Sequence, residues 1–388
     1  MDFSELKKTV DEVELVDGHA HNIVALDSNS AFIHTFTVGA FGDPDAIAFS
    51  RHTLSFKRSL RDVAELYGSE LSLEGVEEYR RVSGIQSICS TCFKAARISA
   101  TLIDDGIELD KRHDIEWHKS FTPFVGRILR IERVAEKILE EGLPDGSPWT
   151  LDSFTEAFVS KLKSYPFHTC EIYGLKTIAA YYSGLQINTN VTEKEAEEGL
   201  IKVLSAGKPL YLLNKNLVDY IFLLSLEVAQ SYDLPMQIHT GFGDKFLDLR
   251  LSNPLHLRAV LEDKRFSKCR FVLLHASFPF SREASYLASV YSQVYLDFGL
   301  AIPKLSVHGM ITAVKELLDL APINKVMFST DGYTFPETFY LGAKNSRKIV
   351  FSVLRDACID GDLSVPEAVE AAKDILARNA VRFYKITS

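Results

Sequence analysis

The chain has few cysteines and no basic leader segment at its start. Cysteine accounts for five of the 388 residues, at positions 89, 92, 170, 269 and 358, an odd and scattered set. Disulfide frameworks occur in small secreted chains with dense, paired cysteines, so we expect free thiols in a reducing compartment. The first residues also lack the basic segment and apolar core of a secretory signal, and we expect a cytoplasmic protein.

Positive charge and long apolar runs are scarce as well. Lys and Arg total 43 against 52 Asp and Glu, which gives a formal net charge of −9. Phosphate backbones and anionic membrane surfaces are bound by basic proteins, so we expect neither nucleic acid nor a membrane as the main partner. No run reaches the roughly 18 apolar residues that a spanning helix needs. A small molecule remains the expected partner.

Eight short apolar runs alternate with helical patterns along the chain. Such runs are typical of strands buried on both faces of a parallel sheet. Their alternation with helices favours an α/β fold of the (β/α)8 TIM-barrel type over an open doubly wound sheet, because no glycine-rich turn follows the first run. The predicted strands span residues 13–17, 98–103, 124–131, 172–177, 235–239, 269–275, 294–297 and 325–329.

The stretch from about 43 to 96 exceeds what a minimal barrel needs between its first two strands. Its pattern is helical, with residues 54–67 and 73–83 as the clearest pieces. We expect a helical insertion near the mouth of the barrel and a second helical excursion over residues 145–164. The whole chain, residues 1–388, is then one barrel domain.

Two histidines with a spacing of two, His19 and His21, directly follow the first predicted strand. Side chains with this spacing point to the same side of a strand. In a barrel that side is the interior, at the carboxyl end where active sites lie. Two imidazoles in this position can share one divalent metal, although the motif alone is equally compatible with ordinary histidines in a turn.

Three further potential ligands lie where later strands end. His239 ends the fifth predicted strand, His275 the sixth and Asp331 the eighth. Imidazole nitrogen and carboxylate oxygen suit a borderline metal that keeps one position for water. Each residue alone is more often structural, but their coincidence at strand ends favours a metal site. We expect one or two divalent ions, with Zn²⁺ preferred and Mn²⁺ or Fe²⁺ as alternatives.

Two cationic residues near the predicted mouth have several compatible roles. Lys176, at the end of the fourth strand, could be a carbamylated bridge between two metals, hold a substrate carboxylate, or cap the barrel as a paired ammonium. Arg130 could clamp a substrate carboxylate through two hydrogen bonds, or form a salt bridge with Glu132 or another carboxylate. Further substrate contacts are expected from residues just beyond strand ends: Tyr181, Asp244 and Tyr333.

Other patterns are interpreted as structural. Cys89 and Cys92 have CxxC spacing, but no second pair or nearby histidine completes a zinc site. His113, Trp117 and His118 are interpreted as surface and packing residues. No GxSxG, Walker A or dinucleotide fingerprint is present.

The order of the strand-end residues resembles the amidohydrolase superfamily: HxH after strand one, Lys after four, His after five and six, and Asp after eight. Seven segments more closely resemble the amidohydrolase-like region of plant nodulin/glutamine-synthetase-like proteins and fungal FluG-like proteins. They are LVDGHAHNIV, GLKTIAAYYSGL, LPMQIHTGFGD, LSNPLHLR, VLLHASFPF, YLDFGL and FSTDGY. A glutamine-synthetase-like domain usually follows this region in longer family members. Nothing in the 388 residues resembles one, so we expect no ligase activity from them.

The resemblance implies a metal-dependent barrel hydrolase. It implies metal ligation by His19, His21, His239 and Asp331, with His275 as a ligand or a catalytic group. The superfamily also contains decarboxylases and isomerases, so the resemblance leaves the substrate open. The pairing with a synthetase-like domain suggests γ-glutamyl amides or related amino-acid amides.

Two classes of function remain compatible with the sequence. The first is hydrolysis of a C–N bond in a small carboxylate-bearing amide by metal-activated water, with Asp331 as the proton carrier and His275 or the metal polarising the carbonyl. Arg130 or Lys176 would hold the substrate carboxylate, and a decarboxylase using the same site is the nearest enzymatic alternative. The second is a non-catalytic regulatory or oligomerisation domain. Barrels of this size often self-associate, so a homo-oligomer is compatible with either function.

Overall fold

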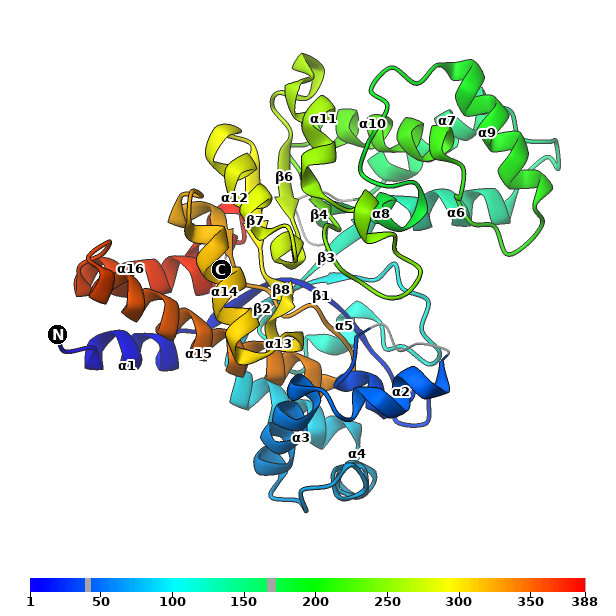
Figure 1. Ribbon diagram of the computed structural model, residues 1–388. Helices are drawn as coiled ribbons and strands as arrows, with labels where there is room; N and C mark the ends of the chain where they lie inside the picture. The colour runs from blue at the N-terminus through cyan, green and yellow to red at the C-terminus, as the bar shows by residue number, and fades with distance from the viewer. Residues whose placement is uncertain (39–42, 166–171, 388) are drawn as a thin grey trace.

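Parallel strands that follow one another in chain order form the centre of the structure (Figure 1). The computed structural model describes residues 1–38, 43–165 and 172–387. The order of strands in the sheet is β10-β1-β2-β3-β4-β5-β6-β7-β9, and every pairing is parallel. The strands are β1 (Leu15–Ile23), β2 (Ile98–Asp104), β3 (Phe124–Arg130), β4 (Ile172–Thr177), β5 (Pro235–Ile238), β6 (Arg270–Leu273), β7 (Val294–Asp297), β9 (Val326–Met327) and β10 (Gly332–Thr334), with a short β8 (Gly299–Leu300) outside this sheet.

The eighth strand of the barrel is interrupted. β9 pairs with β7 and β10 pairs with β1, so the segment 326–334 joins the two edges of the sheet. Within it, the carbonyl of Phe328 accepts a hydrogen bond from the Gly18 N–H, and the Asp331 N–H donates to the carbonyl of His19. The barrel prediction is therefore confirmed, but the eighth strand, predicted over residues 325–329, is only Val326–Met327 before the break. Asp331 has a φ of 49°, which no strand residue adopts.

The first strand also extends further than predicted. β1 includes both His19 and His21, which the sequence analysis placed beyond its end. All nine residues of β1 are buried. The strand continues through His19 and His21 because the polar atoms of both rings find hydrogen-bond partners inside the barrel. The strands β2 to β7 begin and end within two residues of the predicted positions.

Helices surround the sheet, and their caps follow local sequence signals. Thr192 and Glu195 form a capping box at the start of α9. Helix α7 lies within the predicted helical excursion over residues 145–164, and Thr150 caps its start. The helices are α1 (Ser4–Glu12), α2 (Pro44–Ser50), α3 (Leu54–Tyr67), α4 (Leu73–Ala96), α5 (Ile115–His118), α6 (Ile131–Glu141), α7 (Leu151–Lys163), α8 (Ala179–Tyr182), α9 (Glu193–Ser205), α10 (Lys215–Ser231), α11 (Arg258–Glu262), α12 (Ser281–Val290), α13 (Ala301–Lys304), α14 (Val307–Leu318), α15 (Pro336–Asp360), α16 (Val365–Lys373) and α17 (Asn379–Tyr384).

Helices α2, α3 and α4 lie between β1 and β2 in sequence and stand together at the bottom of Figure 1. Their apolar side chains form a cluster of their own with the start of α15. A buried ion pair between Arg80 of α4 and Glu337 of α15 lies in this cluster. The Arg80 guanidinium also lies 4.1 Å from the ring centroid of Phe32. The inserted helices are thus fixed to the start of α15, which follows Asp331 in the chain.

The lower interior of the barrel is filled by side chains from the strands and from α17. Val16, Leu102, Ile128 and Val272 belong to this cluster, together with Tyr384 of α17. Large apolar residues in layers are typical of a barrel core, which is packed and is not a pore. The last helix therefore closes the barrel below the carboxyl ends of the strands.

His118 is buried, so its interpretation as a surface or packing residue is only half right. Its Nε2 accepts a hydrogen bond from the Ile23 N–H at 3.1 Å, and its Nδ1 lies 2.7 Å from the Asp114 carbonyl. The ring therefore ties α5 to the end of β1. His113 stacks on Trp117, with ring centroids 3.8 Å apart.

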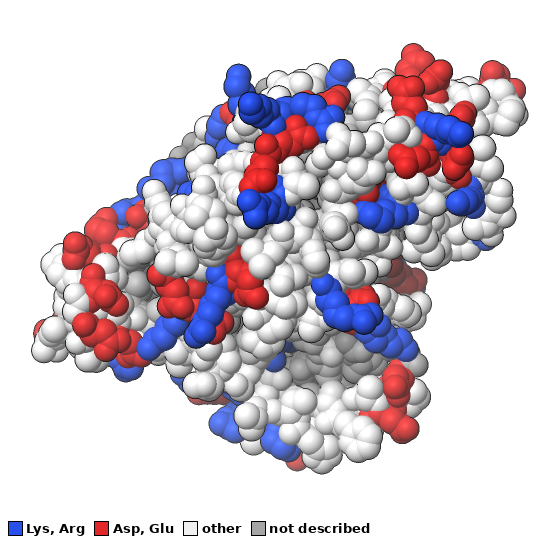
Figure 2. Space-filling model, turned by 45° about the horizontal axis from the view of Figure 1, so that its top comes forward, with Lys and Arg blue, Asp and Glu red and all other residues white. Residues whose placement is uncertain are grey.

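The four cysteines among the described residues are free and buried, and Cys170 lies outside the described residues. Lys and Arg side chains are interspersed with Asp and Glu over the face seen in Figure 2. In the described part of the chain, no helix combines the length and the apolar character needed to cross a bilayer.

Candidate metal site at the carboxyl ends of the strands

Three side chains converge inside the mouth of the barrel. Nε2 of His19 and Nε2 of His21 each lie 3.3 Å from the same oxygen, Oδ1 of Asp331. The histidines come from β1, and Asp331 comes from the break in the neighbouring eighth strand. The backbone hydrogen bond from Asp331 to His19 holds the two strands in this register.

Hydrogen bonds determine which ring nitrogen of each histidine faces the site. Nδ1 of His19 lies 2.8 Å from Oε1 of Gln237, and Nδ1 of His21 lies 2.8 Å from the Asp104 carbonyl oxygen. Both oxygens are acceptors, so each Nδ1 carries the proton and each Nε2 presents a lone pair. Two lone pairs and a carboxylate oxygen then face one another with no proton between them. A divalent cation is the group that such a set of acceptors fits.

Burial favours the neutral form of three histidines of the cluster, His19, His239 and His275. Desolvation lowers the pKa of His19 to about 3 and that of His275 to about 4. The pKa of His239 is also held well below its ordinary value, chiefly by burial. Neutral imidazole is the form that binds a metal, so these residues need lose no proton near neutral pH.

His239 and His275 form a second contact of the same kind. Nδ1 of His275 lies 3.2 Å from the Gly299 carbonyl, and Nε2 of His239 lies 3.1 Å from the Phe242 carbonyl. The remaining nitrogens, Nε2 of His275 and Nδ1 of His239, are 3.1 Å apart. Because both rings donate to carbonyl oxygens, two lone pairs again meet without a proton.

Two overlapping groups of donor atoms could hold an ion, and both include His19. The first combines His19, His21 and Asp104, and the second combines His19, His275 and Asp331. Within each group the donor atoms lie within 4.8 Å of one another. Four of the five predicted ligands are therefore in these groups, and His239 is joined to them through His275.

Strained backbone is found at the same strand ends. His275 has a φ of 66° and Asp331 a φ of 49°, both in the left-handed region. Side chains other than glycine rarely adopt this conformation, and it is concentrated at functional sites. The strain aims both side chains into the mouth of the barrel.

Arg130 is bound to a carboxylate of the protein. Its Nε and Nη2 lie 3.0 and 2.6 Å from Oδ2 of Asp104. Burial alone would raise the pKa of Asp104, but Arg130 holds it below its ordinary value. Of the two predicted roles, the structure shows the salt bridge, with Asp104 as the carboxylate. Glu132 instead accepts a hydrogen bond from the Ile178 N–H.

Lys176 of β4 reaches the centre of the site. It is 1 % exposed, and its Nζ lies 3.2 Å from Nε2 of His19. Burial lowers its pKa to about 8. Among the described residues no carboxylate oxygen lies within ion-pair distance of this amine, so the predicted cap by a paired ammonium is not what the structure shows.

The three predicted loop residues surround this cluster. The Tyr181 ring lies 4.8 Å from that of His239, measured between centroids, and its hydroxyl accepts from the Asp244 N–H at 3.4 Å. The Asp244 carboxylate is turned toward its own loop, where Oδ1 accepts from the Phe246 N–H. Tyr333 donates its hydroxyl to the His34 carbonyl at 3.0 Å.

Sequence reasoning missed Asp104 and Gln237, although signals for both are present. Asp104 is the last residue of β2, so it satisfies the strand-end criterion that identified the other ligands. Gln237 precedes His239 by two residues, the same spacing as in the HxH motif. Asp17 and Asp297 were missed too. Their carboxylates accept hydrogen bonds from the Thr330 and Gly299 backbone and hold the strand ends in place.

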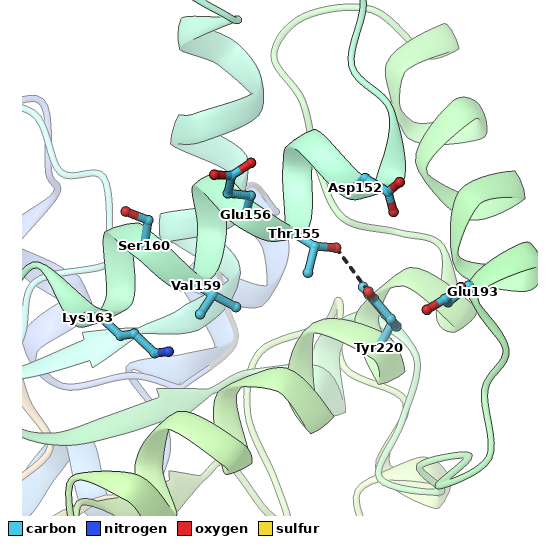
Figure 3. A pocket seen from close by; sticks show the side chains of 8 residues that line it. All are labelled: Asp152, Thr155, Glu156, Val159, Ser160, Lys163, Glu193 and Tyr220. Carbon is cyan, nitrogen blue, oxygen red and sulfur yellow. Dashed lines mark hydrogen bonds between the residues drawn. The ribbon is translucent and has the colours of Figure 1, made fainter.

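A separate hollow of about 590 Å³ lies on the outer helices (Figure 3). It is formed by α7, α10 and the start of α9, and Tyr220 shares a 3.0 Å hydrogen bond with Thr155 at its wall. None of its lining residues is a predicted site residue. Its lining side chains are Asp152, Thr155, Glu156, Val159, Ser160, Lys163, Glu193 and Tyr220.

Comparison with known proteins is consistent with the fold and the geometry. Residues 196–386 match a family described as amidohydrolase. Protein fluG of Emericella nidulans (strain FGSC A4) is 29% identical over 413 aligned residues, which cover 99% of this chain and 47% of that protein. The chain therefore spans about half the length of the curated relative it matches.

Two solved structures share the fold. One is a protein of Lactobacillus casei ATCC 334 with a provisional assignment as a metal-dependent hydrolase. It is 26% identical with a TM-score of 0.85, and the alignment covers 99% of this chain and 98% of that one. Uronate isomerase of Thermotoga maritima is 15% identical with a TM-score of 0.68, over 98% of this chain and 96% of that one, a likeness of fold alone.

Proposed function

We propose that the chain is a metal-dependent hydrolase that cleaves a C–N bond in a small carboxylate-bearing amide. The observation that carries the proposal is the meeting of His19, His21 and Asp331 through three acceptor atoms with no proton between them. The match of residues 196–386 to an amidohydrolase family supports the class of reaction.

His19, His21 and Asp331 would hold the ion, with His239 and His275, which follow β5 and β6, also available. Zn²⁺ is the first choice because the donor set is rich in imidazole nitrogen, and Mn²⁺ or Fe²⁺ are alternatives. When bound, a divalent ion lowers the pKa of water and polarises a carbonyl oxygen. The contact between Lys176 and His19 leaves a second, carbamate-bridged ion as a minor variant of the proposal.

Asp331 has the central role among the residues of the chain. Its carboxylate would accept a proton from the attacking water and pass that proton to the leaving nitrogen, so that amide and water become carboxylic acid and amine. Burial and the neighbouring strands keep this carboxylate in one orientation. The Lys176 amine, directly beside His19, would stabilise negative charge that develops on the carbonyl oxygen.

A γ-glutamyl amide is the substrate class that we favour within this proposal. Support comes from the resemblance to the amidohydrolase-like region of FluG-like proteins, and from the alignment of 99% of the chain with a fungal relative of that name. In longer relatives a glutamine-synthetase-like domain would act on related γ-glutamyl chemistry.

The test is metal analysis followed by amide assays on the purified chain. We expect one or two equivalents of a divalent ion, and release of an amine from γ-glutamyl amides. Asp331→Asn should lower turnover by orders of magnitude without loss of secondary structure, while the exposed Asp360→Asn should leave it unchanged. Wild-type turnover in Asp331→Asn would exclude this role for Asp331. Release of CO2 in place of an amine would identify a decarboxylase.

A further inference from the structure

We propose that Lys304 binds an anionic group of the substrate, a carboxylate, at a subsite that the segment 32–35 helps to build. The proposal rests on the proposed function only for the identity of the substrate, because the subsite itself is defined by the positions of charges and carbonyl groups. Lys304 and the segment 32–35 were not singled out by the sequence, whereas Tyr333 was expected to contact substrate.

Lys304 is the last residue of α13 and lies against the segment between β1 and α2. Its Nζ donates to the Thr35 carbonyl at 2.6 Å and lies 3.5 Å from the His34 carbonyl. The Tyr333 hydroxyl donates to the same His34 carbonyl, and the Lys304 Nζ lies 5.8 Å from the centroid of the Tyr333 ring. One backbone segment thus holds both a cation and a phenol.

This cluster adjoins the candidate metal site. Tyr333 follows Asp331 by two residues. Gly299, at the start of the turn that leads to Lys304, accepts from His275 through its carbonyl at 3.2 Å. A Cβ atom on Gly299 would lie only 3.0 Å from the Asp331 amide nitrogen, so the turn begins directly against the site. The charge of Asp331 is close enough to act on the Lys304 ammonium.

The Lys304 ammonium has no counter-ion in the described part of the chain. Its partners are carbonyl oxygens, whereas Arg130 is paired with Asp104. Burial lowers the pKa of Lys304 to about 7. A bound ion would neutralise Asp331 and leave Lys304 without compensating charge. A substrate carboxylate supplies the missing charge and forms a charge-assisted hydrogen bond.

The backbone around Lys304 is fixed from outside the barrel. Arg58 of α3 donates from Nη2 to the carbonyls of Pro303 and Leu305, the two neighbours of Lys304. The side chain therefore projects from a held turn, which reduces the ordering cost of binding. The helices after β1 would thus act on substrate choice through Lys304, while the strands supply the metal donors.

The chain contains a matched control. Lys325 is also half-buried, donates to two backbone carbonyls (Ala288 at 2.8 Å and Tyr291 at 2.9 Å), and lies 5.5 Å from a tyrosine ring. It precedes β9, at the opposite end of the barrel from Asp331. Both lysines donate to backbone carbonyls, but only Lys304 lies near Asp331. A difference in glutarate affinity between the Lys304 and Lys325 variants would therefore come from the position of Lys304 beside the site.

The experiment measures binding of glutarate to the purified full chain by calorimetry, with glutaramide as the neutral isostere. We expect the Kd for glutarate to rise at least about tenfold in Lys304→Met, which is the loss of one charge-assisted hydrogen bond. Lys304→Arg should retain much of the affinity, and Lys325→Met should bind as the wild type does. Metal content should be equal in all four proteins.

Equal glutarate affinity in the wild type and in Lys304→Met would overturn the proposal, as would absence of glutarate binding to the wild type at millimolar concentration. Tighter binding of glutaramide than of glutarate would also overturn it. If Lys304→Met loses glutarate but no amide is hydrolysed by the wild type, the subsite stands and the proposed hydrolysis fails. If amides are hydrolysed and Lys304→Met binds glutarate normally, the subsite alone fails.

Discussion

Oε1 of Gln237 lies 2.8 Å from Nδ1 of His19, and this contact decides which nitrogen of the His19 ring faces Asp331. The same amide donates from Nε2 to the Gly18 carbonyl and to the Tyr384 hydroxyl, each at 2.7 Å. Its orientation is therefore fixed by three partners. A buried amide side chain thus sets the tautomer of a proposed metal ligand.

Replacing Gln237 by leucine should weaken metal binding. The Nδ1 proton of His19 would lose its acceptor, and the ring could present either nitrogen to the site. We expect roughly a 10- to 100-fold loss of Zn²⁺ affinity, as for other partners of metal-bound histidines. Competition with a chromophoric chelator measures the change. Tyr384→Phe is the control, because it leaves Oε1 in place. Unchanged affinity in Gln237→Leu would show that this contact does not set the tautomer.

Removal of the HxH pair should abolish the site. In the double variant His19→Ala/His21→Ala, only one of the three converging donor atoms remains, so we expect the bound metal to fall to background. Elemental analysis of freshly purified protein is the measurement. His308→Ala, an exposed histidine, should keep the wild-type metal content. Retention of metal by the double variant would place the ion elsewhere in the molecule.

The residues of the candidate site could be predicted from the sequence because strands buried on both faces produce clear apolar runs. Once the runs are aligned, His239, His275 and Asp331 stand at equivalent ends. The same criterion would have found Asp104. Lys304 could not be found in this way, because it lies on a short helix beyond β7 and its partners are backbone carbonyls, which have no sequence signal.

The buried pair between Arg80 and Glu337 should contribute strongly to the stability of the fold. Arg80→Met leaves the Glu337 carboxylate in an apolar cluster without its positively charged partner, and we expect a loss of about 3–5 kcal/mol in the free energy of unfolding. Urea denaturation measures the loss. Arg81→Met is the matched control, because its pair with Glu78 is exposed and such pairs contribute about 0–1 kcal/mol. Similar effects of the two substitutions would contradict this prediction.

His118 should make the fold sensitive to acid. Burial lowers its pKa from 6.5 to about 4 in the folded chain. Between these values the unfolded chain binds a proton that the folded chain does not, so the stability falls as the pH drops from 6.5 toward 4. The full effect is about 3 kcal/mol.

The measurement for His118 is a difference between two proteins. His118→Gln keeps an acceptor and a donor but does not titrate, so its stability should depend less on pH between 7 and 4.5. Urea denaturation of the wild type and the variant at both pH values gives the comparison, in which other histidines cancel. Parallel stability curves would mean that His118 takes up its proton in the folded state.

The boundaries of β1 and of the eighth strand could not be predicted, for related physical reasons. Polar residues normally end a buried strand, but His19 and His21 have partners inside the barrel, so β1 continues past them. The eighth strand breaks where Asp331 takes a positive φ, and the surrounding contacts enforce that conformation. Both exceptions occur at the candidate site, where local preference gives way to function.

The interrupted eighth strand makes the barrel seam and the candidate site one and the same place. Asp331 belongs to the segment 326–334, which joins the two edges of the sheet. A chain cut before Val326 would keep every histidine of the cluster, but it would lack both this closing segment and the Asp331 carboxylate. An ion bound there would link β1 to the interrupted eighth strand through His19, His21 and Asp331. Stripping it with a chelator would then loosen the barrel along one line, and hydrogen exchange would rise first in β1 and β10.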